Sequence, residues 1–195
     1  MSGDVTDGWR RAGLEGVWRR SLAFHPDDRG SFAEIWRSDE MRGLPGLPGG
    51  VAIRQANLSR SRAGVLRGLH VHRRQADLWI VLEGHPFIGL VDTRPAVQGT
   101  GDVRVETIDA VAGDALYLPE GVAHGFYARD PITLLYFVTN EYDGTDELGF
   151  AWDDPVAAVP WPDRTPILSP RDSAAPPLAD LLAHLRGDDQ QSVSR

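Results

Sequence analysis

Four side chains able to bind a metal ion or to move a proton lie close together in the middle of the sequence. His70 and His72 are one residue apart, Asp77 follows after four more residues, and His124 ends a Pro-x-Gly-x-x-His motif. Three imidazoles and one carboxylate suit a divalent cation that keeps two open octahedral positions for Lewis-acid or oxygen chemistry. Alternatively, His70 acts as a base, which requires a free lone pair that a metal ligand no longer has. The pattern therefore predicts either a metal-dependent reaction or proton transfer by a metal-free His70.

Short β-branched and aliphatic segments must position these residues. They recur between Val51 and Tyr142, separated by Gly, Pro and Asp, at 51–57, 65–72, 77–83, 87–93, 103–108, 115–118 and 132–139. This spacing predicts an all-β sandwich or barrel. Because side chains alternate between the faces of a strand, His70 and His72 should project into the barrel together. Residues 73–76 allow a turn back, and a second hairpin framed by glycines should deliver His124 from another wall.

The ends of the chain differ from this central part. Residues 1–20 should form an N-terminal arm and a first strand, whereas residues 155–177 hold seven prolines and should form an extended tail around the barrel. Apolar residues at helical spacing predict one short helix over Leu178–Arg186, followed by a frayed end at 187–195. The 195 residues suit a single domain, 1–195.

Composition excludes several classes of function. The net charge of −8 disfavours nucleic-acid and anionic-membrane partners. The sequence contains no long apolar run and no signal-peptide pattern near its N-terminus, so we expect a cytoplasmic protein. With no cysteine, a metal would be iron, nickel, manganese or zinc held by His and carboxylates. All 20 basic residues are arginine, so anionic substrate groups must be bound by guanidinium groups.

The glycine-framed histidine motifs resemble the two half-motifs of the cupin superfamily. The first runs from Gly64 to Gly84 and the second from Gly113 to Ala128. Cupins usually have Glu at the position of Asp77 and Asn at that of Ala128. This resemblance implies a jelly-roll barrel and, as one alternative, a metal bound by His70, His72, Asp77 and His124.

A longer set of motifs resembles the dTDP-4-dehydrorhamnose 3,5-epimerase family. These motifs keep the family order over residues 22–173, and residues 174–195 lie beyond this epimerase-like core. They are Asp28–Glu34, Arg54–Ser59, Gly64–His70, Leu118–Phe126, Leu135–Tyr136, Trp152–Pro155, Trp161–Pro162 and Leu168–Asp172.

The resemblance implies a cupin homodimer that inverts C3, C5 or both of a dTDP-4-keto-6-deoxyhexose without a cofactor. His70 would be the base, Asp172 would orient it, and Tyr136 would return a proton to the opposite face. Family positions that bind the nucleotide sugar match Arg29, Phe32, Glu34, Gln55, Asn57, Arg67 and His124.

The departures from the family gather around the reacting centre and leave alternatives open. Asp77 stands where the family has a Lys that supports the enolate, and the segment after His70 is shorter. Ile88 replaces an Asp that could pair with His124. One alternative is a metal-dependent cupin isomerase or oxygenase with a three-His, one-Asp site, and another is a non-catalytic nucleotide-sugar-binding homologue.

Overall fold

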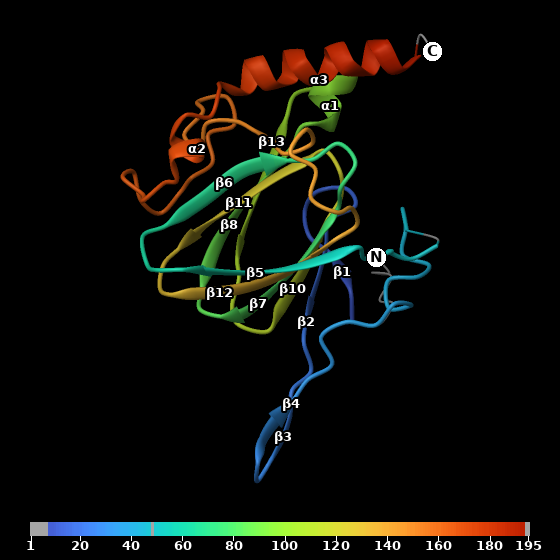
Figure 1. Ribbon diagram of the computed structural model, residues 1–195, viewed down its shortest axis with the longest axis vertical. Helices are drawn as coiled ribbons and strands as arrows, with labels where there is room; N and C mark the ends of the chain where they lie inside the picture. Colours follow the sequence, from blue (N-terminus) through green and yellow to red (C-terminus); the bar gives the residue numbers. More distant parts are fainter. Residues whose placement is uncertain (1–7, 48, 194–195) are drawn as a thin grey trace.

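Two antiparallel sheets face each other in the computed structural model, which describes residues 8–47 and 49–193 (Figure 1). The first sheet has the order β1 (Arg10–Arg11), β2 (Trp18–Ser21), β10 (Asp114–Leu118), β7 (Asp77–Glu83), β12 (Ile132–Val138), β5 (Gln55–Ser61). The second has the order β13 (Leu148–Gly149), β6 (Leu66–Val71), β11 (Val122–Ala128), β8 (Pro86–Asp92), β9 (Arg104–Asp109). From β5 to β8, and again from β9 to β13, consecutive strands alternate between the two sheets, as in a jelly roll.

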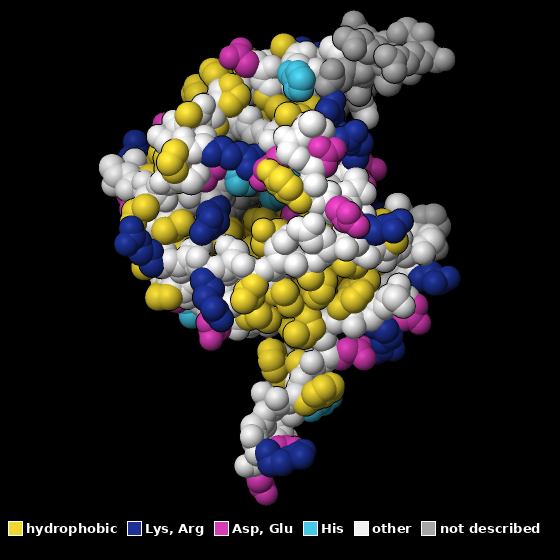
Figure 2. Space-filling view, viewed as in Figure 1, with side chains coloured by type: hydrophobic (Ala, Val, Ile, Leu, Met, Phe, Trp, Pro, Cys, Tyr) yellow, Lys and Arg dark blue, Asp and Glu magenta, His cyan; other side chains and the backbone are white. Residues whose placement is uncertain are grey.

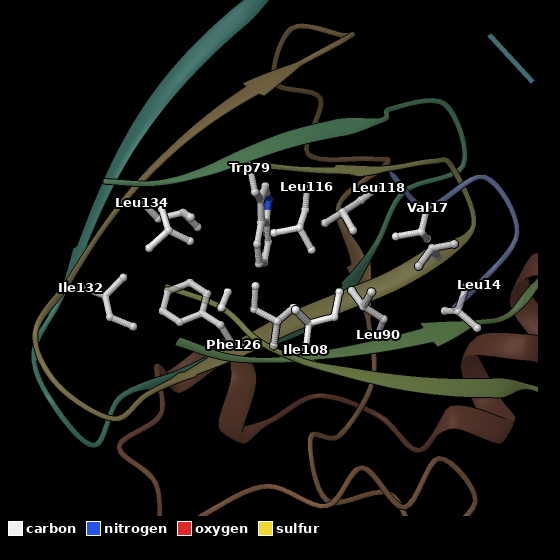
Figure 3. Packing of buried hydrophobic residues seen from close by; sticks show 14 of the residues in the cluster. Leu14, Val17, Trp79, Leu90, Ile108, Leu116, Leu118, Phe126, Ile132 and Leu134 are labelled. Atoms are coloured by element: carbon white, nitrogen blue, oxygen red, sulfur yellow. The ribbon is translucent and has the colours of Figure 1, made fainter. Parts of the chain in front are cut away.

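The main hydrophobic core lies between the two sheets (Figure 3). Trp79 and Leu116 point inward from the first sheet, and Leu90 and Phe126 point inward from the second. The rings of Trp79 and Phe126 meet edge to face, with centroids 5.9 Å apart. This packing closes one end of the barrel and leaves the other end for polar side chains.

Segments outside the sheets cover part of their outer faces. On the first sheet, residues between β4 and β5, including Met41 and Leu44, pack onto Leu78 and Ile80. On the second, the C-terminal tail and helix α3 (Leu178–Val193) pack apolar residues against β6, β8 and β11. The tail therefore wraps the barrel as its composition predicted. It also contains a short helix, α2 (Pro170–Ser173), which begins at the capping residue Ser169.

A hairpin of β3 (His25–Asp27) and β4 (Gly30–Phe32) projects away from the barrel (Figure 1). We call residues 24–34 the arm; this segment is distinct from the N-terminal residues 1–20. Phe24 and Phe32 are 53% and 69% exposed, which is unusual for large apolar side chains. The arm therefore presents apolar surface that the described residues of the chain leave largely uncovered.

Several local expectations were wrong. The turns at 73–76 and 119–121 connect strands of different sheets, so neither closes a hairpin. The motif that ends at His124 continues as strand β11, and a short helix, α1 (Arg94–Gln98), follows the predicted strand 87–93. Helix α3 runs to Val193 instead of ending near Arg186. Among the described residues, no helix combines the length and apolar character needed to cross a membrane.

Candidate functional site

A pocket of about 290 Å³ opens at the polar end of the barrel. Its walls come from β5, β6, β7, β11 and β12, and its rim comes from residues 140–147 and α2. Figure 2 shows histidine side chains inside a hollow of the surface, with arginines near its edge. The pocket thus contains the residues that the sequence singled out for chemistry.

His70 forms a hydrogen-bonded chain with Asp172 and Ser169. Its Nε2 donates to Asp172 Oδ1 at 2.7 Å, and the Ser169 hydroxyl donates to Asp172 Oδ2 at 2.9 Å. Burial acts to raise the pKa of Asp172, but its hydrogen bonds and the nearby charges outweigh this and hold the pKa below the ordinary value. A carboxylate only accepts, so the proton of neutral His70 lies on Nε2 and Nδ1 keeps a free lone pair.

Tyr136 lies on β12 and lines the same pocket. Its register partners are Trp79 on β7 and Asn57 on β5. Burial, followed by the charge of Asp77, raises the pKa of the Tyr136 hydroxyl. The hydroxyl therefore stays protonated at neutral pH and is able to donate a proton.

His72, Asp77 and His124 form a separate cluster in the pocket. One potential ligand atom from each lies within 4.8 Å of the other two, whereas His70 is not part of this group. His124 Nε2 is 3.7 Å from Asp77 Oδ2, and burial lowers the pKa of His124 to about 4. Of the four predicted metal ligands, the structure brings three together and pairs the fourth with Asp172.

A polar wall on β5 and β6 holds three of the predicted substrate-binding residues. The Gln55 amide donates to Asn57 Oδ1 at 2.8 Å, and Arg67 Nε donates to Ser61 Oγ at 2.9 Å. All three predicted residues line the pocket, and Arg67 is exposed within it. This wall can offer amides and a guanidinium to a bound anion.

Of the four remaining predicted substrate-binding residues, His124 lines the pocket, whereas three lie on the arm and do not line this chain's pocket. Arg29 pairs with Asp27 at 2.6 Å, and Glu34 pairs with Arg37 at 2.5 Å. Phe32 extends into solvent. Within one chain, the arm residues therefore lie outside the pocket that holds His70, Tyr136 and Asp172.

Sequence reasoning missed the pocket rim. Arg74 pairs with Asp143, Arg171 pairs with Glu147, and buried Asp146 accepts hydrogen bonds from two backbone N–H groups. These residues belong to loops and to α2, so no strand periodicity indicated them. An Asp-Gly-Thr-Asp stretch at 143–146 was the one local signal, and it predicts only a turn.

Comparisons with known proteins agree with this geometry. A family model described as dTDP-4-dehydrorhamnose 3,5-epimerase matches residues 11–180. The chain is 38% identical over 175 residues to a dTDP-4-dehydrorhamnose 3-epimerase from Streptomyces niveus, which covers 88% of this chain and 84% of the relative. It is 36% identical over 182 residues to the dTDP-4-dehydrorhamnose 3,5-epimerase of Mycobacterium tuberculosis, with 89% of each covered.

Solved structures give the same result. A 4-keto-6-deoxy sugar epimerase from the novobiocin gene cluster of Streptomyces spheroides superposes with a TM-score of 0.79 at 36% identity, covering 95% of this chain and 96% of that one. A 3'-monoepimerase from Streptomyces bikiniensis in complex with dTDP-quinovose has a TM-score of 0.75 at 29% identity, covering 92% and 96%. On the family model, the sequence relatives and these structures together, the chain belongs to the dTDP-4-dehydrorhamnose 3,5-epimerase family of isomerases.

Proposed function

We propose that the protein epimerises C3, C5 or both of a dTDP-linked 4-keto-6-deoxyhexose. The observation that carries this proposal is the His70–Asp172 pair beside Tyr136 in one pocket. Relatives named as 3-epimerases and as 3,5-epimerases support both stereochemical outcomes. The reaction requires no organic cofactor, because the substrate's own ketone acidifies the neighbouring C–H bonds.

The proposed base is the free Nδ1 of His70. It removes the proton next to the C4 ketone, and the C–H electron pair moves to the ketone oxygen to give an enolate. The negative charge of Asp172 stabilises the imidazolium that forms and holds the useful tautomer. Inversion needs a proton donor on the other face, and the protonated hydroxyl of Tyr136 supplies it.

Solved structures of relatives support these two roles. One is a double mutant of the Streptomyces bikiniensis 3'-monoepimerase, with a His-to-Asn and a Tyr-to-Phe substitution, in complex with dTDP. Histidine and tyrosine are the residue types that we assign here as base and acid. Retention of dTDP by that double mutant fits a pocket in which nucleotide binding and proton transfer use different residues.

We also propose that the enzyme works as a homodimer in which the arm reaches the partner's pocket. Figure 2 shows hydrophobic side chains gathered over the first sheet just above the arm. Leu58 on β5 and Leu82 on β7, both strands of this sheet, are 53% and 36% exposed. A second copy covering this surface would bury Phe32 and bring Arg29 to a phosphate-binding position that its own chain does not provide.

Nucleotide-sugar binding on the inner wall is assigned to Gln55, Asn57 and Arg67. The bidentate guanidinium of Arg67 suits a diphosphate, and the two amides suit a sugar or a base edge. His124, predicted from the family to touch the sugar, lies deeper and is considered below. The cytoplasmic location expected from the sequence stays a prediction.

Solvent-exchange NMR of dTDP-4-keto-6-deoxyglucose in D2O tests the function. We expect deuterium at C3, C5 or both with the wild-type chain and none above background with His70→Asn. His85→Asn, a substitution in an exposed turn, is the matched control and should leave exchange unchanged. Tight dTDP-sugar binding without any exchange by the wild-type chain would support the non-catalytic alternative instead.

A further inference from the structure

Three lone pairs converge in the pocket without a positive charge between them. His72 Nδ1 donates to the backbone oxygen of Asp146 at 2.8 Å, and His124 Nδ1 donates to that of Val122 at 3.0 Å. A carbonyl oxygen only accepts, so in both neutral rings the proton is fixed on Nδ1 and Nε2 is left bare. The bare Nε2 of His124 lies 3.7 Å from Asp77 Oδ2, and one potential ligand atom each of His72, Asp77 and His124 lie within 4.8 Å of one another.

The hydrogen-bond donors that the described residues offer to Asp77 carry no charge. The Asp77 side chain is 3% exposed and accepts from the Gln75 amide at 2.9 Å and from the Trp79 indole at 3.2 Å. Both donors are neutral, and a buried carboxylate is costly unless a positive charge accompanies it. The 3.7 Å gap between Asp77 Oδ2 and His124 Nε2 is also too long for a hydrogen bond that would share a proton.

We propose that His72, Asp77 and His124 bind a divalent first-row transition-metal ion, which leaves His70 free to act as the base. Ligands about 2.1 Å from such an ion are about 3.4 Å apart in a tetrahedral site, so small side-chain rotations bring the cluster to that spacing. Two imidazoles and one carboxylate form the donor set that such ions take while keeping open positions.

The ring hydrogen bonds supply the supporting shell that such a site needs. Metal-binding histidines usually donate their second ring N–H to a carbonyl or carboxylate, which fixes the tautomer and the ring orientation. His72 and His124 do this through two different backbone carbonyls, one on the pocket rim and one on β11. The hydrogen bonds from Gln75 and Trp79 restrain Asp77 in the same way. The geometry therefore assigns metal binding to the cluster and proton abstraction to His70, whereas the sequence pattern allowed either role for His70.

The ion would have a role in the proposed epimerisation, and this part of the inference rests on that function. When His70 Nδ1 takes the α-proton, the electron pair of the broken C–H bond moves to the C4 oxygen. A cation beside that oxygen stabilises the enolate. Without it, the negative charge of Asp77 would oppose the enolate.

Metal binding is tested first, with the full chain freed of metal by EDTA and dialysis. Titration calorimetry with Zn²⁺, Mn²⁺ and Co²⁺ should give one tight site for at least one ion. His72→Ala and Asp77→Asn should each weaken that site at least 100-fold, whereas His85→Ala, which also removes one imidazole, should not change it. Absence of a one-to-one site in the wild-type chain, or wild-type affinity in either pocket variant, would overturn the proposal.

A second measurement needs no variant. Copper(II) bound to the wild-type chain should show EPR splitting from two imidazole nitrogens, and a spectrum without them would exclude this ligand set. Deuterium exchange is then compared before and after metal loading. Exchange that is already complete in the metal-free chain would refute the catalytic role of the ion. Tight metal binding with no exchange in either form would instead refute the epimerase function and leave the metal site standing.

Discussion

The role of Asp172 predicts that asparagine is a worse replacement than alanine at this position. In Asp172→Asn, the Ser169 hydroxyl still has an acceptor in the amide oxygen and so turns the amide NH2 toward His70. That group donates to Nε2, which moves the histidine proton to Nδ1. The nitrogen that should accept the substrate proton is then occupied. Alanine removes the carboxylate but leaves the tautomer free.

The two variants differ in expected size of effect. A hydrogen bond to a charged group contributes about 1.5–3 kcal/mol, which corresponds to about 10–150-fold in rate. We expect Asp172→Ala to lose that much kcat/KM. Fixing the wrong tautomer lowers the rate further. In a serine protease, an Asp-to-Asn change that has this effect lowers kcat by about 10⁴-fold. Asp172→Asn should therefore lose about 10³–10⁴-fold.

The assay is the initial rate of deuterium incorporation into dTDP-4-keto-6-deoxyglucose between pH 5 and 9. Circular dichroism and binding of dTDP control for folding and for an intact nucleotide site. Activity of Asp172→Asn equal to or above that of Asp172→Ala would show that the carboxylate does not set the tautomer of His70.

Three further outcomes are expected. Tyr136→Phe should keep proton exchange while losing epimer formation by about 10²–10⁴-fold, which NMR of the product mixture measures; equal loss of both would contradict its role as the acid. The pKa of Asp172 is depressed in the folded state, so the stability difference between wild type and Asp172→Asn should be present above about pH 4, the unfolded-state pKa. It should disappear as the pH falls through the folded-state pKa, as urea unfolding at pH 6 and pH 3 would show. Phe32→Ser should shift the protein toward monomer in sedimentation experiments and raise KM with a smaller change in kcat, and an unchanged dimer with unchanged KM would contradict the role of the arm.

The sequence was sufficient for the parts of the fold that repeat locally. Strand alternation predicted that His70 and His72 face the same space and that Asp77 begins the next strand. It did not reveal that these neighbours belong to different sheets, because a short connection looks the same in a hairpin and in a crossing between sheets. Strand β11 was missed since Gly121 and Gly125 weaken its strand signal.

The candidate site was only partly accessible from the sequence. His70, Asp172 and Tyr136 come from distant segments, and family motifs, not periodicity, put them together. The division between a base and a three-residue cluster could not be read from spacing. It depends on which carbonyl or carboxylate each ring contacts, and the contact of His72 comes from Asp146, which is 74 positions away in the chain. Such contacts are fixed only by tertiary folding.

The projecting arm has a consequence for mixed assemblies. If recognition residues on one subunit serve the pocket of another, a subunit with a dead pocket and an intact arm can complement a subunit with a working pocket and no arm. A hybrid of two defective chains would then contain one competent site, although neither homodimer has any. The arm and the pocket could accordingly diverge at different rates during evolution. Specificity for the nucleotide and the reaction on the sugar would then change independently of each other.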